Sequence, residues 1–154
     1  MNFTYIDELI KNCQLAKETN PNQEFVLDNL CQLDNVLKAI YIIKEVKGSK
    51  GVTFDNFKKY KSKKERKCSR LNLPSSVLYV GSSTTGIRKR IRQHLGLGYK
   101  GTYSLHLGYW FTGEYEITIK TYNELIPINV LQIIEDNLSY QLKPAFGKQG
   151  GNNK

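Results

Sequence analysis

Three stretches of the chain carry the apolar patterns of β-strands. Residues 39–46 ("AIYIIKEV") and 76–81 ("SVLYVG") are rich in β-branched and aromatic side chains, which predicts two buried strands. Residues 114–120 alternate polar and apolar side chains, which predicts an amphipathic strand. We therefore predict a mixed α/β (α+β) fold in which these segments form one three-stranded antiparallel sheet flanked by helices.

Helical spacing dominates the chain before the first strand. Residues 5–15 and 25–37 both place apolar side chains at helical intervals, with "TNPNQ" as a break between them. This pattern predicts an N-terminal helical extension over residues 1–38, which covers the core or a partner. The remaining chain, residues 39–154, is then the core domain.

A basic helix is predicted directly after the second strand. "GSSTTG" forms a turn, and in the helix that follows it Ile87, Ile91 and Leu95 make the buried stripe. Arg90 and His94 lie four residues apart along one border of that stripe. This unit therefore brings a guanidinium and an imidazole to the same edge of the core.

A second core helix is predicted after Pro127, over "INVLQIIEDNLSYQL". Its apolar residues recur on one face. Glu135 lies at the border of that face, whereas Asp136 points outward. Of the two neighbouring acids, Glu135 is the one predicted to lie near the core.

Residues 47–75 separate the first two strands by more than a hairpin needs, and they are strongly basic. We predict an insertion in the core domain that either has its own role or forms a flexible tail. A run such as "KKYKSKKERK" is usually a solvated face or a disordered segment. On a chain with a large positive charge, contact with phosphate is the more plausible role.

Composition favours one domain and a polyanionic partner. The 154 residues are 40% hydrophobic, which suits a single moderate core, and 23 basic against 14 acidic side chains give a net charge of +9. Nucleic acid is the first expectation, and an acidic membrane surface is the alternative. No apolar run is long enough to span a bilayer and no secretory signal is evident, so we expect a soluble, cytoplasmic protein.

The three cysteines predict no covalent or metal framework. Cys13, Cys31 and Cys68 are odd in number and far apart in the sequence. We expect reduced thiols, with Cys13 and Cys31 in helical core positions.

Taken in order, these segments resemble the GIY-YIG nuclease superfamily. "AIYII" and "LYVG" are similar to the two halves of its signature, and an arginine, a histidine and a later glutamate follow over residues 39 to about 147. The resemblance implies hydrolysis of DNA phosphodiesters with a divalent metal, Mg²⁺ or Mn²⁺. It also implies catalytic roles for Tyr41, Tyr79, Arg90, His94 and Glu135, with Glu135 as the metal ligand.

The chain departs from the family pattern at three positions. Ala39 stands where glycine is usual and Val80 where isoleucine is usual, and both changes are small and apolar. Gly147 stands where the family commonly has an asparagine. Lys148, Gln149 or Asn152 would have to substitute for it, or the contact is absent.

The chemistry of these side chains suits phosphodiester hydrolysis. Arg90 can offer two parallel hydrogen bonds to phosphate and stays charged, and Glu135 offers the hard oxygen that Mg²⁺ prefers. Tyr41 can act as general base if nearby cations lower its pKa, and His94 is the alternative. Without the resemblance, the tyrosines would be interpreted as packing residues, His94 as a satisfied polar group and Glu135 as a partner of a lysine.

We expect a metal-dependent DNA endonuclease that acts on double-stranded DNA, with a restriction-like role as one option. A homodimer or higher homo-oligomer is one way for it to cut both strands. The alternative is a catalytically inactive nucleic-acid-binding module on the same scaffold. In either case the expected DNA contacts are basic side chains of the insertion, of the basic helix and of the C-terminus, together with one C-terminal asparagine: Lys58, Lys59, Lys61, Lys63, Lys64, Arg66, Lys67, Arg88, Lys89, Arg92, Lys148 and Asn152.

Overall fold

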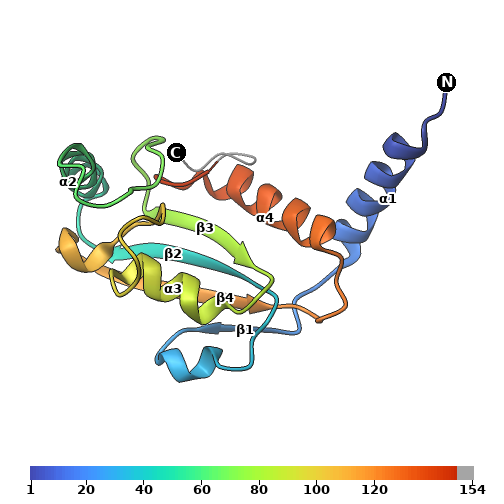
Figure 1. Cartoon of the computed structure of the whole chain (residues 1–154), viewed down its shortest axis with the longest axis horizontal. Coiled ribbons are helices and arrows are strands. Elements are labelled where there is room, and N and C mark those ends of the chain that lie inside the picture. Colours follow the sequence, from blue (N-terminus) through green and yellow to red (C-terminus); the bar gives the residue numbers. More distant parts are fainter. Residues whose placement is uncertain (149–154) are drawn as a thin grey trace.

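A computed structural model describes residues 1–148 of the chain. It is a mixed α/β structure built on one four-stranded antiparallel sheet in the order β1-β4-β2-β3 (Figure 1). The strands are β1 (Gln23–Val26), β2 (Ala39–Lys47), β3 (Val77–Ser83) and β4 (Glu114–Thr121). The helices are α1 (Thr4–Glu18), α2 (Lys50–Ser62), α3 (Ile87–Leu95) and α4 (Ile128–Leu142), with short 3-10 turns η1 (Leu30–Leu33) and η2 (Leu107–Tyr109).

The three predicted strands and their antiparallel pairing are confirmed. β2 lies in the middle, where Tyr41 pairs with Gly81 of β3 on one side and with Ile119 of β4 on the other. Tyr79 pairs with Ile43, so the two tyrosines are diagonal neighbours on one face of adjacent strands. This register is the first step in bringing the signature residues together.

The prediction of only three strands is wrong, and so is the helix predicted over residues 25–37. β1 adds a fourth strand at the sheet edge, where Phe25 pairs with Ile119. The apolar spacing of this segment is also compatible with a strand, because Phe25 and Leu27 alternate with exposed neighbours and pack against the core. The edge of β4 favours the strand over the helix. As a strand, residues 23–26 satisfy the backbone hydrogen-bonding groups along this edge, which a surface helix would leave unpaired.

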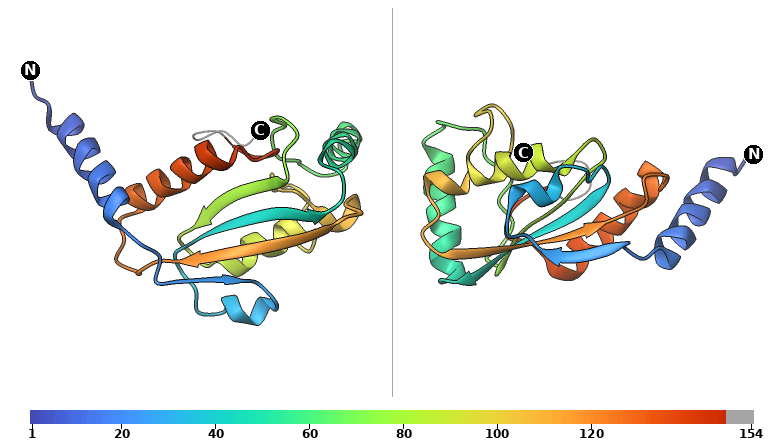
Figure 2. Two further views of the ribbon diagram at one scale, coloured as in Figure 1. Left: turned by 180° about the vertical axis from the view of Figure 1, so that it is seen from behind. Right: turned by 90° about the horizontal axis from the view of Figure 1, so that it is seen from below.

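The two faces of the sheet are covered by different helices. On one face, Ile87 and Ile91 of α3 pack with Tyr41 in the larger core. On the other, Val130 and Leu131 of α4 pack with Ile40 in a smaller core. The right-hand view of Figure 2 shows α3 and α4 on opposite sides of the strands.

The basic segment 47–75 is anchored to the protein rather than being a tail. Its helix α2 buries Phe57, whose ring lies 4.3 Å from that of Phe146 and 4.9 Å from that of Trp110. The lysines of α2 therefore project from a helix whose other side belongs to the core.

Helix α1 is confirmed as a helix, but it buries none of its residues. It projects from the body and touches α4 near one end of the molecule (Figure 1).

The predicted placement of Cys13 and Cys31 in the core is wrong, because both are exposed and only Cys68 is buried. Cys13 faces outward on the projecting helix, and Cys31 lies in a surface 3-10 turn. Among residues 1–148, no helix has both the length and the apolar character needed to cross a membrane.

Candidate active site

Two stacked tyrosines form the centre of the candidate active site. The rings of Tyr41 and Tyr79 are nearly parallel, at 2°, with centroids 6.0 Å apart, and both residues are buried. Gly81, opposite Tyr41 on β3, leaves the room for this stack, because a Cβ on Gly81 would overlap the hydroxyl end of Tyr41. A glycine at this position is therefore required by the packing of the two rings.

His94 connects the helix α3 to this stack and is completely buried. Its Nε2 lies 2.8 Å from the hydroxyl of Tyr41, and its Nδ1 accepts a hydrogen bond from the backbone N–H of Leu105 at 3.1 Å. Because Nδ1 is an acceptor, a neutral imidazole carries its proton on Nε2 and donates it to the Tyr41 oxygen. The hydroxyl proton of Tyr41 is then directed away from His94.

The pKa of His94 is held well below its usual value, first by burial and then by the charges of Arg90 and His106. His94 is therefore neutral at physiological pH, and the lone pair of its Nδ1 is occupied by the Leu105 amide. This arrangement favours a role in orienting Tyr41 over the role of general base.

Arg90 reaches the same stack from the border of α3. It donates one hydrogen bond to the hydroxyl of Tyr79 and one to Oε1 of Gln93, both at 3.0 Å. A guanidinium has five N–H donors, so this leaves further donors for a phosphate. The burial of Ile87 and Ile91 fixes the orientation of the helix, which places Arg90 and His94 at the predicted border.

Tyr41 is protonated at neutral pH. Burial raises its pKa well above the usual value, the charge of Tyr79 adds to this, and Arg90 acts in the opposite direction. The carboxylate of Glu135 also raises this pKa, as the smallest of these effects. In the absence of a further cation, Tyr41 is thus a hydrogen-bond donor rather than a base.

Glu135 supplies the acidic part of the site and is only 1% exposed. Its Oε2 accepts a hydrogen bond from Gln132 at 2.9 Å and lies 3.5 Å from the ammonium of Lys148, whereas its Oε1 has no partner among the described residues. A buried carboxylate oxygen without a partner is costly unless a cation or water completes it. Its neighbour Asp136 is exposed, as predicted.

This acidic part fits a weakly chelated, hydrated metal rather than a closed metal cage. Within residues 1–148, no cluster of three or more His, Cys, Asp or Glu side chains is placed to hold a metal ion. Mg²⁺ commonly takes one or two carboxylates and keeps several waters, so one carboxylate with an open oxygen is compatible with it. Glu135 is the residue that would hold it.

The chain after α4 passes directly beside Tyr79. Asn72 fixes this segment, because its side-chain amide donates to the carbonyls of Pro144 and Gly147, at 3.1 and 3.2 Å. Gly147 has a φ of +110°, and a Cβ there would lie 2.7 Å from the ring of Tyr79. The position where the resemblance implies an asparagine is therefore open only to glycine, and Lys148 follows it against Glu135. Gln149 and Asn152, the other suggested substitutes, lie outside the described residues.

The predicted DNA-contact residues divide into two groups. Several are engaged inside the protein: Arg66 donates to the Gly98 carbonyl and the Tyr109 hydroxyl, Lys61 to the Ser69 carbonyl, and Arg88 pairs with Asp34. Lys67 lies over the ring of Tyr103, at 5.5 Å. The remaining cations outside the site project into solvent: Lys58, Lys59, Lys63, Lys64, Lys89 and Arg92.

The site also uses residues that sequence patterns did not indicate. The Leu105 amide fixes the tautomer of His94, Gln132 holds Glu135, and Asn72 holds the segment that carries Lys148. Every residue has a backbone amide, so the sequence does not indicate which amide will bind His94. Asn72 was not indicated because its partners are far away in the chain, and Gln132 was not indicated because it lies on a helix face with other polar residues.

Comparison with known proteins gave no match to a protein family model, to a curated protein or to a solved structure.

Proposed function

We propose that this chain is a metal-dependent DNA endonuclease of the GIY-YIG type. The observation that carries this proposal is the cluster of Tyr41, Tyr79, Arg90 and His94. Gly147 lies against the ring of Tyr79, and the next residue, Lys148, contacts a buried Glu135 that keeps one carboxylate oxygen unpaired. A phenol, a guanidinium and a carboxylate able to hold a hard cation are the groups that phosphodiester hydrolysis requires.

Each side chain has a role that follows from its contacts. Arg90 binds the scissile phosphate with the donors that Tyr79 and Gln93 do not use, and it neutralises the charge that grows on the phosphoryl oxygens. Tyr79 holds Arg90 in place. His94 donates to Tyr41, which orients the Tyr41 hydroxyl proton toward the phosphate or the attacking water.

Tyr41 can take a proton from water only after its pKa falls. Arg90 and the His94 donor both stabilise the phenolate, but burial outweighs them in the metal-free protein. A divalent cation held by Glu135 would supply the missing positive charge and would help to neutralise the phosphate. The chain thus provides orientation and phosphate binding, and Glu135 couples both to a metal.

Double-stranded DNA is the proposed substrate. The net charge of +9 and the solvent-exposed lysines of α2 suit a polyanionic duplex. Each chain carries one candidate site, so cutting both strands requires either two copies or two successive events. A restriction-like role with a homodimer is compatible with this requirement.

A catalytically inactive DNA-binding module is the second candidate. Lys148 lies 3.5 Å from Oε2 of Glu135, where its ammonium already neutralises the carboxylate. If this ion pair persists when DNA and metal are present, the cationic surface binds DNA but no cleavage follows.

A plasmid-nicking assay with and without Mg²⁺ or Mn²⁺ separates the two candidates. The endonuclease proposal expects supercoiled plasmid to be converted to nicked or linear DNA only when metal is present. Two variants accompany the wild type: Glu135→Gln should lose nicking, whereas the matched control Glu124→Gln removes an exposed carboxylate away from the site and should leave nicking in place. DNA binding without nicking under any metal condition would support the inactive module instead.

A further inference from the structure

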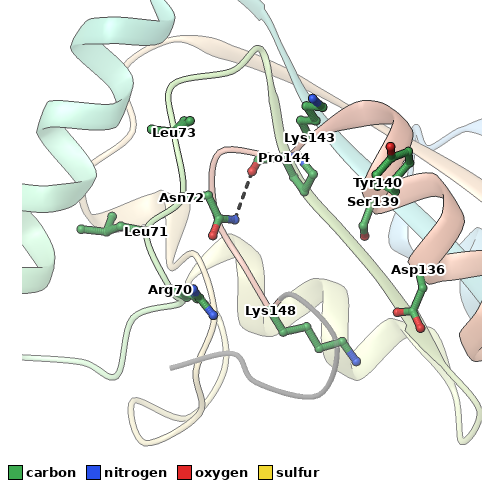
Figure 3. Close-up of a pocket in the computed structure, with 10 residues that line it drawn as sticks. All are labelled: Arg70, Leu71, Asn72, Leu73, Asp136, Ser139, Tyr140, Lys143, Pro144 and Lys148. Carbon is green, nitrogen blue, oxygen red and sulfur yellow. Dashed lines mark hydrogen bonds between the residues drawn. The ribbon is translucent and has the colours of Figure 1, made fainter.

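A groove leads away from Glu135 along the outer side of α4. Its volume is about 630 Å³, and it lies between the segment Arg70–Leu73 and the C-terminal half of α4. Figure 3 shows Arg70 and Asn72 on one wall, Ser139, Tyr140 and Asp136 on the other, and Lys148 extending between Arg70 and Asp136. Lys148 also contacts Glu135, so the groove opens directly beside the proposed metal ligand.

The charge of the groove suits a phosphate backbone. Three cationic side chains line it, Arg70, Lys143 and Lys148, against the single carboxylate of Asp136. Among the described residues, Arg70 and Lys143 have no acidic partner, so their charges are not neutralised within the protein. Asp136 is engaged by Gln132, whose amide donates to it at 2.9 Å.

Lys143 ends α4 at the mouth of the groove. Lys143 has a φ of +48° at the C-terminal end of α4, a left-handed conformation that glycine or asparagine adopts more readily. This conformation is a common way for a helix to end, and the N–H of Lys143 donates to the Ser139 carbonyl. The Lys143 side chain forms no ion pair with the described residues, so its ammonium is available to a ligand in the groove.

Tyr140 adds an aromatic surface to the same groove. Its side chain is 79% exposed, whereas the nearby Leu138 and Leu142 are partly buried against the smaller core. An exposed tyrosine beside unpaired cations suits the backbone of a duplex, with the cations on the phosphates and the tyrosine against the sugar–phosphate chain.

We propose that this groove holds the DNA strand next to the scissile phosphate, with Arg70 and Lys143 on adjoining phosphates and Tyr140 against the intervening nucleotide. This proposal rests on the proposed endonuclease function, because it assigns the groove to the same substrate. Lys148 connects the two sites, since it lines the groove and contacts the metal ligand. The groove residues act on affinity and placement of the strand, and the chemistry remains with Arg90, Tyr41 and Glu135.

The first test compares DNA affinity between matched charge variants in EDTA, so that no cleavage occurs. The double variant Arg70→Gln, Lys143→Asn removes both cations, and asparagine keeps the left-handed conformation at position 143. The control, Lys11→Asn together with Lys17→Gln, removes two charges from α1 near the opposite end of α4. Thermal unfolding of each variant verifies that it is folded.

We expect the groove variant to bind duplex DNA about tenfold more weakly at low salt, and the slope of log affinity against log salt to fall by about 1.8, or roughly 0.9 per lost phosphate contact. The control pair should change neither quantity by as much. Equal losses in the two pairs, or an unchanged slope in the groove variant, would overturn the proposal.

The second test locates the DNA by photocrosslinking. A p-benzoylphenylalanine replaces Tyr140 in one protein and Tyr5 in another, since these tyrosines are similarly exposed at 79% and 75%. Crosslinks from position 140 and few from position 5 are expected, and the reverse result would contradict the proposal.

The nicking assay separates this proposal from the proposed function. A wild-type protein that never nicks plasmid refutes the endonuclease, while the affinity and crosslinking results still decide whether the groove binds DNA. A wild-type protein that nicks while the groove variant binds like its control refutes the groove alone. If both proposals hold, the groove variant shows a raised KM with kcat changed by less than about threefold.

Discussion

The two halves of the candidate site differ in how complete they are. On the tyrosine side, Tyr41, Tyr79, Arg90 and His94 form a closed set of contacts. On the acidic side, Glu135 is just as buried, yet its Oε1 has no partner among the described residues and its Oε2 lies beside a partly exposed lysine.

This difference indicates where a ligand is needed. A closed network is stable by itself and keeps its geometry before the substrate arrives, which lowers the cost of organising the transition state. An unpaired buried carboxylate oxygen is unfavourable by itself and becomes favourable when a cation binds. Under the proposed function, the tyrosine side would be preorganised for phosphate and the acidic side would accept the metal.

The largest effect is expected from removing the acidic half. Glu135→Gln keeps the size of the side chain but removes the anionic ligand, so plasmid nicking should fall by about a thousandfold or more while DNA binding is retained. Mg²⁺ or Mn²⁺ should raise the melting temperature of the wild type and not of this variant. Full activity of Glu135→Gln would show that the two halves do not work as proposed.

A smaller loss is expected from the tyrosine half. Arg90→Ala removes the group that stabilises charge developing on the phosphate, so kcat should fall by about 100- to 1,000-fold, with a much smaller change in affinity. Arg92→Ala is the matched control, because Arg92 lies on the same helix but projects into solvent. A loss confined to KM in Arg90→Ala would place its role in ground-state binding.

The exposed lysines in the last turn of α2 and directly after it should affect binding only. Neutralising Lys58, Lys59, Lys63 and Lys64 together should weaken binding to specific and random DNA alike and reduce the salt slope by up to about 3.6, at roughly 0.9 per phosphate contact. Lys61 is left in place because it donates to the Ser69 carbonyl. Cleavage at saturating DNA should survive, and an unchanged salt slope would mean that α2 presents only a solvated face.

The smallest effect concerns pH and the two buried histidines, His94 of the tyrosine side and His106 beside it. Burial lowers the pKa of both His94 and His106 in the folded protein, so the unfolded chain binds protons that the folded chain does not. Stability should therefore fall as pH drops below about 6.5, the unfolded value, by up to about 1.4 kcal/mol per pH unit for each histidine.

Thermal unfolding between pH 5.5 and 7.5 measures this dependence. His94→Gln should be less stable at neutral pH, because it loses the pairing with Tyr41 and Leu105, but its melting temperature should depend less on pH. An identical pH dependence in the variant would show that His94 does not titrate on unfolding in this range.

Much of the fold was determined by the sequence itself. The β-branched and aromatic runs specify β2 and β3, the alternating run specifies β4, and the apolar stripes specify α3 and α4. The borders of those stripes also placed Arg90, His94 and Glu135 toward the core, since helical periodicity fixes which side of a helix each residue occupies.

Other features were decided only by the tertiary structure. The segment around Phe25 has spacing compatible with either a helix or a strand, and the open edge of β4 makes it a strand. The tautomer of His94 depends on the Leu105 amide, 11 residues away, and the pairing of Glu135 with Lys148 depends on the turn held by Asn72. The physical reason is the same in each case: local patterns select an element and its buried face, whereas hydrogen-bond partners and the burial of charge depend on segments that meet only in the folded chain.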